Sequence, residues 1–303
     1  DVIQKRTKDV WHKDVRLYEI LDKSKNLRGK FYFDLYARQH KRGGAWMDEC
    51  IQRRVKSNGS IQPPVAFITC NSSPPTKNSP AFFTHYDVET LFHEFGHGLQ
   101  HMLTTVNYAG ISGISGVEWD AVELPSQFME NWCWEKEVLD TFAFHFETNS
   151  KLPNSLFKKL LATKNYNSGM ALIRQVEFSL FDFLLHMDGQ KNKAKLADKV
   201  LANVRKETSL IPVHQNNKFQ NSFAHIFAGG YAAGYYSYKW AEVLSADAFM
   251  AFKEQKLVDR KVGNRFMKKI LETGGSKPAL ELFVDFRGRE PKIEPLLQSL
   301  GLK

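Results

Sequence analysis

The pattern of apolar and polar residues divides the chain into a short strand-like part and a long helical part. The clearest helical pattern covers residues 86–103, where apolar side chains return every three or four positions. The apolar residues of this stretch are Val88, Leu91, Phe92, Phe95, Leu99, Met102 and Leu103. Thr84 and Asp87 are both candidates to cap its first turn, so we expect the helix to begin near them.

Before this helix the apolar runs are shorter. Residues 31–36 and 65–69 have the alternating or continuous apolar character of strands. Residues 71–80 are rich in proline and serine, and we expect them to form a loop. A first helix is expected at residues 11–21.

Helical patterns dominate the rest of the chain. One long helix is expected at residues 123–146, bent near Pro125. Shorter helices are expected at residues 154–162, 168–187, 193–208, 234–252, 259–272 and 277–283. The pattern therefore predicts a mainly α-helical fold with a small β-sheet, and we expect a single domain over residues 1–303.

Composition narrows the class of protein. The 303 residues are 43% hydrophobic, which is ample for a sizeable core. No apolar run of about 18 residues occurs, so no membrane-spanning helix and no membrane partner are expected. The three cysteines, Cys50, Cys70 and Cys133, lack metal-ligand spacing. They predict free thiols in a reducing compartment, and hence a cytoplasmic protein.

The net charge of +9 raises the question of nucleic-acid binding. The lysines and arginines are dispersed, and no zinc-finger spacing, RNA-binding sheet motif or continuous basic helix accompanies them. Solvated helix faces explain the charge better, so no nucleic-acid partner is expected. A preference for acidic peptides stays open.

The candidate chemistry lies in the helix at residues 86–103, in the sequence His93-Glu94-Phe95-Gly96-His97. Histidines four residues apart lie on one helix face, about one turn from each other. Two such imidazoles can hold one zinc ion, and Glu94 between them can take a proton from water. The apolar flanks indicate a buried helix, in which these polar groups need a partner such as a metal ion.

A catalytic zinc ion usually has a third protein ligand. The metzincin arrangement is excluded because Gln100 and Leu103 stand where it requires glycine and histidine. His101 lies eight residues beyond His93, or about 12 Å along a straight helix, which is too far to share the ion.

A glutamate from a later segment is the alternative third ligand. Glu123 is favoured because its neighbours are apolar and a glycine-containing loop lets the chain turn back, while Glu118 and Glu130 stay open. Asp120 is a candidate to accept a proton from the far ring nitrogen of a metal-bound histidine, and equally a candidate helix cap.

The HExxH motif together with Val122-Glu123-Leu124-Pro125-Ser126-Gln127 resembles the thimet oligopeptidase family of zinc peptidases. The resemblance runs from Phe31-Tyr32-Phe33-Asp34-Leu35-Tyr36 to Gly288-Arg289-Glu290-Pro291, which is nearly the whole chain. It implies a zincin-like catalytic domain and one zinc ion. Its ligands would be His93, His97 and Glu123, with Glu94 as the general base.

A second stretch of this resemblance covers residues 223–238. The family has a flexible glycine-rich loop here, and its substrate-facing histidine and tyrosines correspond to His225, Tyr231 and Tyr238. Glycines let a backbone approach a peptide closely, and phenol hydroxyls can donate to the oxyanion that forms during hydrolysis.

The chain departs from the family in length. It resembles the C-terminal half, and the N-terminal helical region that forms the opposite wall of the family's channel has no counterpart. The first residue, Asp1, favours a fragment or a processed chain. We therefore expect a zinc-dependent endopeptidase for short peptides, with the missing N-terminal half as a candidate partner. The alternative is a zinc- and peptide-binding fragment with little turnover.

Overall fold

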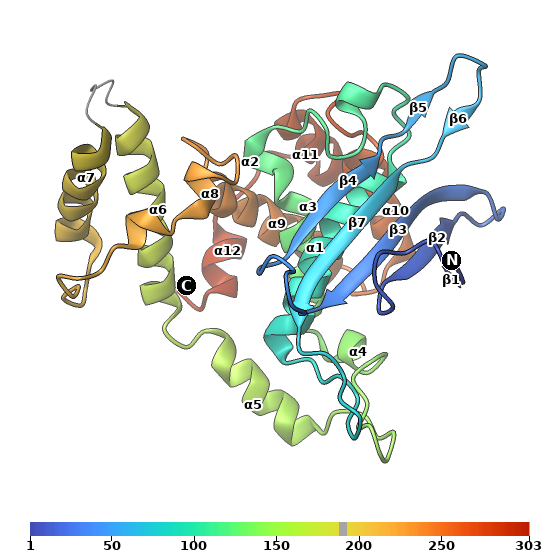
Figure 1. The fold of residues 1–303 in the computed structure, drawn as a ribbon, viewed down its shortest axis with the longest axis horizontal. Coiled ribbons are helices and arrows are strands. Elements are labelled where there is room, and N and C mark those ends of the chain that lie inside the picture. The colour runs from blue at the N-terminus through green and yellow to red at the C-terminus, as the bar shows by residue number, and fades with distance from the viewer. Residues whose placement is uncertain (188–192, 303) are drawn as a thin grey trace.

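The computed structural model describes residues 1–187 and 193–302 of the chain. A twisted sheet lies on one side of the molecule and helices fill the other (Figure 1). Five strands form this sheet in the spatial order β1 (Val2–Lys5), β2 (Arg16–Leu21), β3 (Leu27–Tyr36), β7 (Val65–Ser72) and β4 (Trp46–Ile51). Only β3 and β7 pair in parallel within it, and β4 is an edge strand. A separate ribbon pairs β5 (Arg54–Val55) with β6 (Ile61–Gln62).

Helix α1 (His85–Leu103) lies across the inner face of the sheet. Its start has both bonds of a capping box, in which Thr84 and Asp87 each accept a hydrogen bond from the other's main-chain N–H. Glycines allow the close approach, since a Cβ on Gly98 would lie 2.9 Å from Cδ1 of Ile68 in β7. The helix is therefore packed against the sheet without room for a side chain at this point.

The opposite side of α1 packs against the main helical core. That core contains fifteen buried apolar residues, Phe128, Phe266 and Phe283 among them. Its helices are α2 (Trp119–Val122), α3 (Leu124–Trp132), α9 (Ser237–Lys253), α10 (Arg260–Phe266) and α11 (Ala279–Arg287). A π-helical turn at Met267–Leu271 continues α10.

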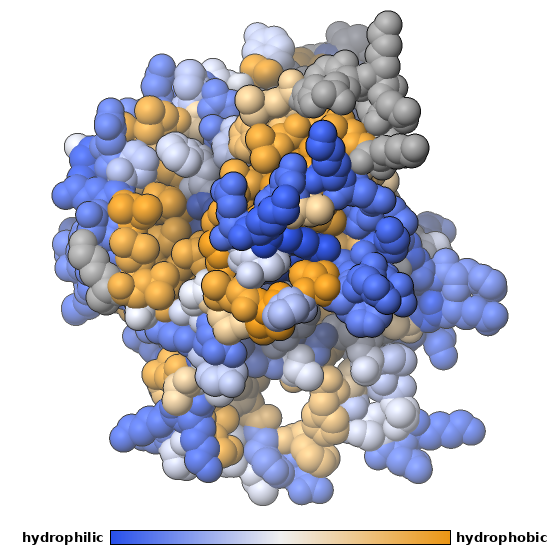
Figure 2. Space-filling model, turned by 90° about the vertical axis from the view of Figure 1, so that its left-hand side faces the viewer, coloured by the Kyte–Doolittle hydropathy of each residue, from blue (hydrophilic) through white to orange (hydrophobic). Residues whose placement is uncertain are grey.

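A second group of helices lies farther from the sheet, with α6 and α7 side by side at the other end of the molecule (Figure 1). Phe181, Leu201 and Phe223 belong to its small core. Its helices are α5 (Asn154–Lys164), α6 (Ser168–Met187), α7 (Lys193–Thr208) and α8 (Ala224–Phe227), and α12 (Glu294–Ser299) packs on α9. Figure 2 faces this end and shows hydrophobic patches among the polar residues.

The expected mainly helical fold with a small sheet is confirmed. The helices expected at 168–187 and 193–208 have these bounds in the structure. The three cysteines are free. Among the described residues, no helix combines the length and apolar character needed to cross a bilayer.

The helix expected at residues 11–21 is wrong. The first part of this segment turns, and Arg16–Leu21 is strand β2. Tyr18 stacks on Phe31 of β3 at 5.1 Å between ring centroids, and Glu19 pairs with Lys30 at 3.0 Å. These partners come from a neighbouring strand, so a local pattern does not reveal them.

The long helix expected at residues 123–146 is also wrong in its length. It ends at Trp132, and after a turn only the short α4 (Lys136–Leu139) follows. The turn buries Cys133 and lets the indole N–H of Trp134 donate to Glu89 of α1 at 2.6 Å. Tertiary contacts therefore end the helix where its apolar pattern continues.

Candidate active site

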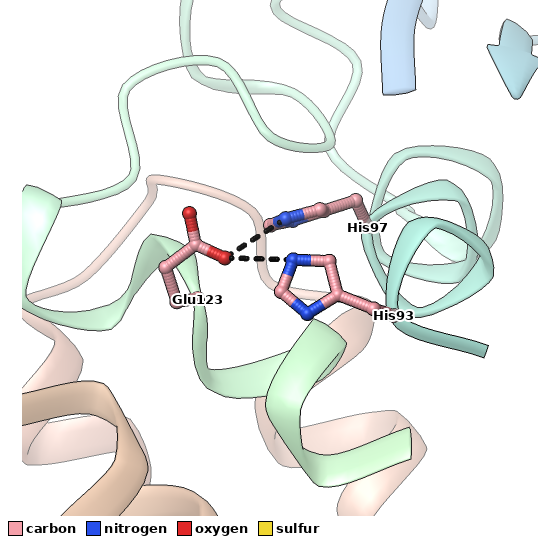
Figure 3. A group of neighbouring side chains, drawn as sticks. All are labelled: His93, His97 and Glu123. Atoms are coloured by element: carbon pink, nitrogen blue, oxygen red, sulfur yellow. Dashed lines mark ion pairs between the residues drawn. The ribbon is translucent and has the colours of Figure 1, made fainter. Parts of the chain in front are cut away.

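Two helices bring together the three expected metal ligands. His93 and His97 project from α1, and Glu123 stands at the junction of α2 and α3 (Figure 3). The Glu123 Oε2 atom lies 3.2 Å from His93 Nε2 and 3.0 Å from His97 Nε2. One ligand atom from each side chain lies within 4.8 Å of the other two.

Close packing of α1 on α3 sets this geometry. A Cβ on Gly96 would meet the carbonyl oxygen of Pro125 at 2.4 Å, so only glycine fits at position 96. Ser126 donates from its hydroxyl to Glu123 Oε2 at 2.9 Å, which orients the carboxylate. Glu123 is 1% exposed, so its charge depends on the groups around it.

The electrostatics of the cluster favour a charged carboxylate. Burial alone would raise the pKa of Glu123, but the neighbouring His97 and His93 outweigh it and hold that pKa well below its ordinary value. Two imidazoles and a buried carboxylate are ligand types that zinc prefers. The residues therefore fit a divalent metal ion.

The far side of His93 is held by Glu130, whose Oε1 lies 2.5 Å from His93 Nδ1. Glu130 thus lies behind the candidate ligand rather than within the cluster. Asp120, the carboxylate that the sequence suggested for this position, instead accepts a hydrogen bond from the Tyr236 hydroxyl. The carboxylate behind His93 comes from the second turn of α3, a placement that depends on how α3 crosses α1.

The other candidates lie away from the cluster. Glu118 accepts the main-chain N–H of Ala279 at 2.8 Å. The His101 Nε2 atom lies 3.0 Å from the carbonyl oxygen of Ile51. Each of these side chains therefore has a partner elsewhere in the fold.

Glu94 is buried at the floor of a cavity of about 950 Å³. Burial is the largest influence on the pKa of Glu94 and raises it above its ordinary value. The cavity joins this residue to the three candidate ligands and to the edge strand. A carboxylate with a raised pKa beside such a cavity is suited to proton transfer.

The loop between α8 and α9, together with the adjoining parts of these helices, forms another wall of the cavity. It is lined by His225 of α8, Tyr231 of the loop and Tyr238 of α9. The Tyr231 hydroxyl donates to Glu123 Oε1 at 2.5 Å. The rings of Tyr231 and Tyr238 stack at 4.8 Å between centroids. Burial raises the pKa of both phenols, so they stay protonated and able to donate at neutral pH.

Sequence reasoning missed one wall, the segment 42–49 that leads into and forms most of β4. Arg42 stacks over the ring of Trp46, and Asn71 donates to the carbonyl oxygens of Arg42 and Gly44. The adjacent glycines, Gly43 and Gly44, were the available signal for a turn before a strand. The local sequence pattern does not indicate that β4 lies beside α1, the helix that carries the HExxH motif.

This fold and cluster are those of a zincin-like metallopeptidase domain. The chain belongs to peptidase family M3, whose sequence model matches residues 2–302. Membership implies a divalent metal ion, in agreement with the cluster of histidines and glutamate. The expected resemblance to the thimet oligopeptidase family is thereby confirmed.

The motifs fit best the bacterial oligopeptidase A subgroup, and its members are similar throughout this chain. Oligopeptidase A of Escherichia coli is 52% identical over 300 residues, which are 99% of this chain and 44% of that protein. The thimet-like oligopeptidase of Dictyostelium discoideum is 37% identical, over 96% of this chain and 44% of that protein. The chain thus spans less than half the length of these curated relatives.

Solved structures share the fold at low sequence identity. PZ peptidase A with an inhibitor aligns with a TM-score of 0.60 at 17% identity, over 89% of this chain and 42% of that chain. The Pyrococcus furiosus carboxypeptidase aligns with a TM-score of 0.54 at 17% identity, over 89% of this chain and 53% of that chain.

Proposed function

We propose that this chain is the catalytic part of a zinc-dependent endopeptidase that hydrolyses short oligopeptides. The observation that carries the proposal is the convergence of His93, His97 and Glu123 beside Glu94 in one large cavity. Each of these residue types has a defined task in metal-assisted hydrolysis.

His93, His97 and Glu123 would hold one zinc ion, and Glu130 would orient His93 from behind. When bound, zinc supplies Lewis acidity, which polarises a peptide carbonyl and favours deprotonation of water near neutral pH. Glu94 takes the proton of the attacking water and passes it to the leaving amine.

The loop side of the cavity supplies hydrogen-bond donors. Tyr238 and Tyr231 line the same cavity as the candidate metal ligands, and their phenols donate to the oxyanion formed by attack on the peptide carbonyl. His225 lies beside Tyr238, with 6.0 Å between ring centroids, and is placed to contact the same peptide. Burial lowers the pKa of His225, which favours its neutral form.

The edge strand supplies a main-chain binding surface. One side of β4 pairs with β7, and β4 is the last strand of its sheet on the other side. An extended peptide can add to such an edge by main-chain hydrogen bonds, which accept many side chains. This mode suits a peptidase for oligopeptides, in keeping with the names of the similar proteins.

Substrate size depends on what surrounds the cavity. The relatives are more than twice as long as the matched segment, so the N-terminal half of such a protein is a candidate partner that would complete the channel. The alternative function is a zinc- and peptide-binding fragment with little turnover. We propose a cytoplasmic protein without nucleic-acid or membrane partners, which agrees with its free thiols.

A quenched fluorogenic oligopeptide tests the proposal. We expect zinc-loaded protein to cleave it, a chelator to stop cleavage, and Glu94→Gln to lower kcat at least about 100-fold while one zinc ion per chain is retained. Glu89→Gln is the matched control, because Glu89 lies on α1 but hydrogen-bonds to Trp134 outside the cavity.

Two outcomes decide between the functions. Cleavage that survives Glu94→Gln would contradict the assigned general base. Stoichiometric zinc and peptide binding without cleavage would favour the fragment alternative, and addition of a separately expressed N-terminal half should then restore turnover.

A further inference from the structure

A fully buried carboxylate on α6 contacts the loop between α8 and α9 (residues 228–236) from outside the cavity. Asp182 is 0% exposed and is not among the residues that line the cavity. Its Oδ1 accepts the main-chain N–H of Ala233, and its Oδ2 accepts that of Tyr235, each at 2.9 Å. His186 Nδ1 lies 2.9 Å from Oδ1. The carboxylate therefore accepts a hydrogen bond from each of two loop amides, while His186 Nδ1 also lies 2.8 Å from the main-chain carbonyl oxygen of Asp182.

These two amides lie between the phenols that the proposed reaction uses. Ala233 comes two residues after Tyr231, and Tyr235 comes three residues before Tyr238. Ala233 has φ of +56°, a left-handed conformation that side-chain-bearing residues rarely adopt. Such a backbone persists only when its surroundings hold it, and both amides that flank Gly234 are held by Asp182.

We propose that Asp182 is a positioning residue that fixes this loop so that the Tyr231 and Tyr238 hydroxyls face the candidate metal ligands. The proposal rests on the proposed peptidase function for its catalytic consequence only. A carboxylate has an acceptor oxygen for each amide, whereas an asparagine offers one oxygen and sets its NH₂ against the other N–H. A carboxyl group is therefore needed to accept both amides, although it never touches the substrate.

The same helix supplies a matched control. Glu177 is 2% exposed, one and a half turns before Asp182, and its Oε1 accepts hydrogen bonds from Arg174 and Arg205. The bond from Arg205 joins α6 to α7, the bond from Arg174 lies within α6, and neither involves the loop between α8 and α9. Glu177→Gln therefore disturbs a buried acid of α6 without touching the two loop amides.

Amide hydrogen exchange of the native protein tests the anchor without any assay of activity. In the described structure the N–H groups of Gly230 and Ala232 have no hydrogen-bond acceptor. We expect the amides of Ala233 and Tyr235 to exchange at least about tenfold more slowly than these two. Equal rates at all four amides would overturn the proposal, whether or not any variant folds.

The variants test the consequence. Asp182→Asn should speed exchange at Ala233 and Tyr235 at least about tenfold, while Glu177→Gln leaves both rates unchanged. Asp182→Asn should also lower kcat about tenfold or more with little change in KM and with one zinc ion retained. In a Tyr231→Phe/Tyr238→Phe background the same substitution should cost less than about threefold, since the groups that it positions are gone.

The outcomes separate the two hypotheses. An equal loss of kcat in Asp182→Asn and Glu177→Gln, or a full loss from Asp182→Asn in the double-phenylalanine background, would show general damage and overturn positioning. If zinc-loaded wild-type protein cleaves no peptide, the proposed function fails, while slow exchange of the two amides still supports the anchor and fast exchange still refutes it.

Discussion

The two walls of the cavity are built in opposite ways. The helical wall, where α1 meets α3, is close-packed: Gly96 leaves no room for a methyl group, and Gly98 and Met102 of α1 pack on the sheet. The loop wall, residues 224–238, contains exposed residues such as Phe227 and holds Ala233 in a left-handed conformation. A few hydrogen bonds hold the loop, whereas many contacts hold the helices.

This difference assigns different tasks to the two walls. Close-packed helices keep the spacing of His93, His97 and Glu123 before any ion arrives, so little reorganisation is needed to bind it. A loop held at few points can adjust to peptides of different sequence. The comparison predicts that changes in the helical wall affect stability and metal binding, whereas changes in the loop wall affect turnover.

The largest effect is expected in the loop wall. Tyr238→Phe removes one donor to the oxyanion and should lower kcat by about 10²–10³ with unchanged thermal stability. Tyr235→Phe is the control, because its hydroxyl donates to Gln175 on α6 instead, and we expect less than about a fivefold loss. Steady-state kinetics and thermal melting measure both; similar losses of kcat would erase the distinction between the two phenols.

The next effect concerns the helical wall. Gly96→Ala places a Cβ 2.4 Å from the Pro125 carbonyl oxygen, so α1 and α3 must separate. We expect unfolding free energy to fall by about 3 kcal/mol, together with weaker zinc binding. Gly263→Ala in α10 meets nothing within 4 Å and should raise stability by about 0.5–1 kcal/mol. Urea unfolding that ranked these two variants the other way round would refute the packing argument.

Metal affinity should respond to the carboxylate behind His93. Glu130→Gln weakens the hydrogen bond to His93 Nδ1 and should lower zinc affinity about 10- to 100-fold. Glu135→Gln, at an exterior pair with Lys253, should leave affinity within about twofold. Competition with a chromophoric chelator measures both, and an unchanged affinity in Glu130→Gln would deny this residue a role in orienting the histidine.

The sheet beside the helical wall gives a pH prediction. Burial of Asp34 opposes ionisation, but hydrogen bonds from Arg38, Trp11 and Lys41 outweigh it and lower its pKa from 3.8 to about 2. A lowered folded-state pKa contributes stability that is present above about pH 4 and lost as pH falls toward 2. Asp34→Asn should cost about 2 kcal/mol at pH 7 and little at pH 2. Denaturant unfolding across that range is the measurement, and a cost independent of pH would refute the assignment.

The motif helix was predictable because everything that specifies it is local. Its cap, Thr84 with Asp87, and its apolar spacing are visible in the sequence, and so is the placement of His93 and His97 on one face. The loop residues were predicted from the family resemblance and not from a local pattern. Spacing alone left Glu123 in competition with two other glutamates.

What escaped prediction depends on contacts between distant segments. Strand β4 is short and has two acidic residues at its centre, and it becomes a strand because its main chain pairs with β7. The roles of Asp120 in α2 and of Glu130 in α3 depend on their tertiary contacts with Tyr236 and His93, since both are acids near Glu123 in sequence. Similarly, Asp182 is an ordinary helix residue until the loop around Ala233 is placed against it.

The hydrogen bond from Tyr231 to Glu123 makes one carboxylate common to both walls. A bound peptide that accepts the hydrogen bond of the Tyr231 hydroxyl removes that bond from Glu123 and so changes how strongly Glu123 binds the cation. Peptide binding and cation binding are therefore linked thermodynamically. Thermodynamic linkage then requires that peptide changes the affinity for the cation by the same factor as the cation changes the affinity for peptide. Measured in either order, occupancy of the one reports on the other.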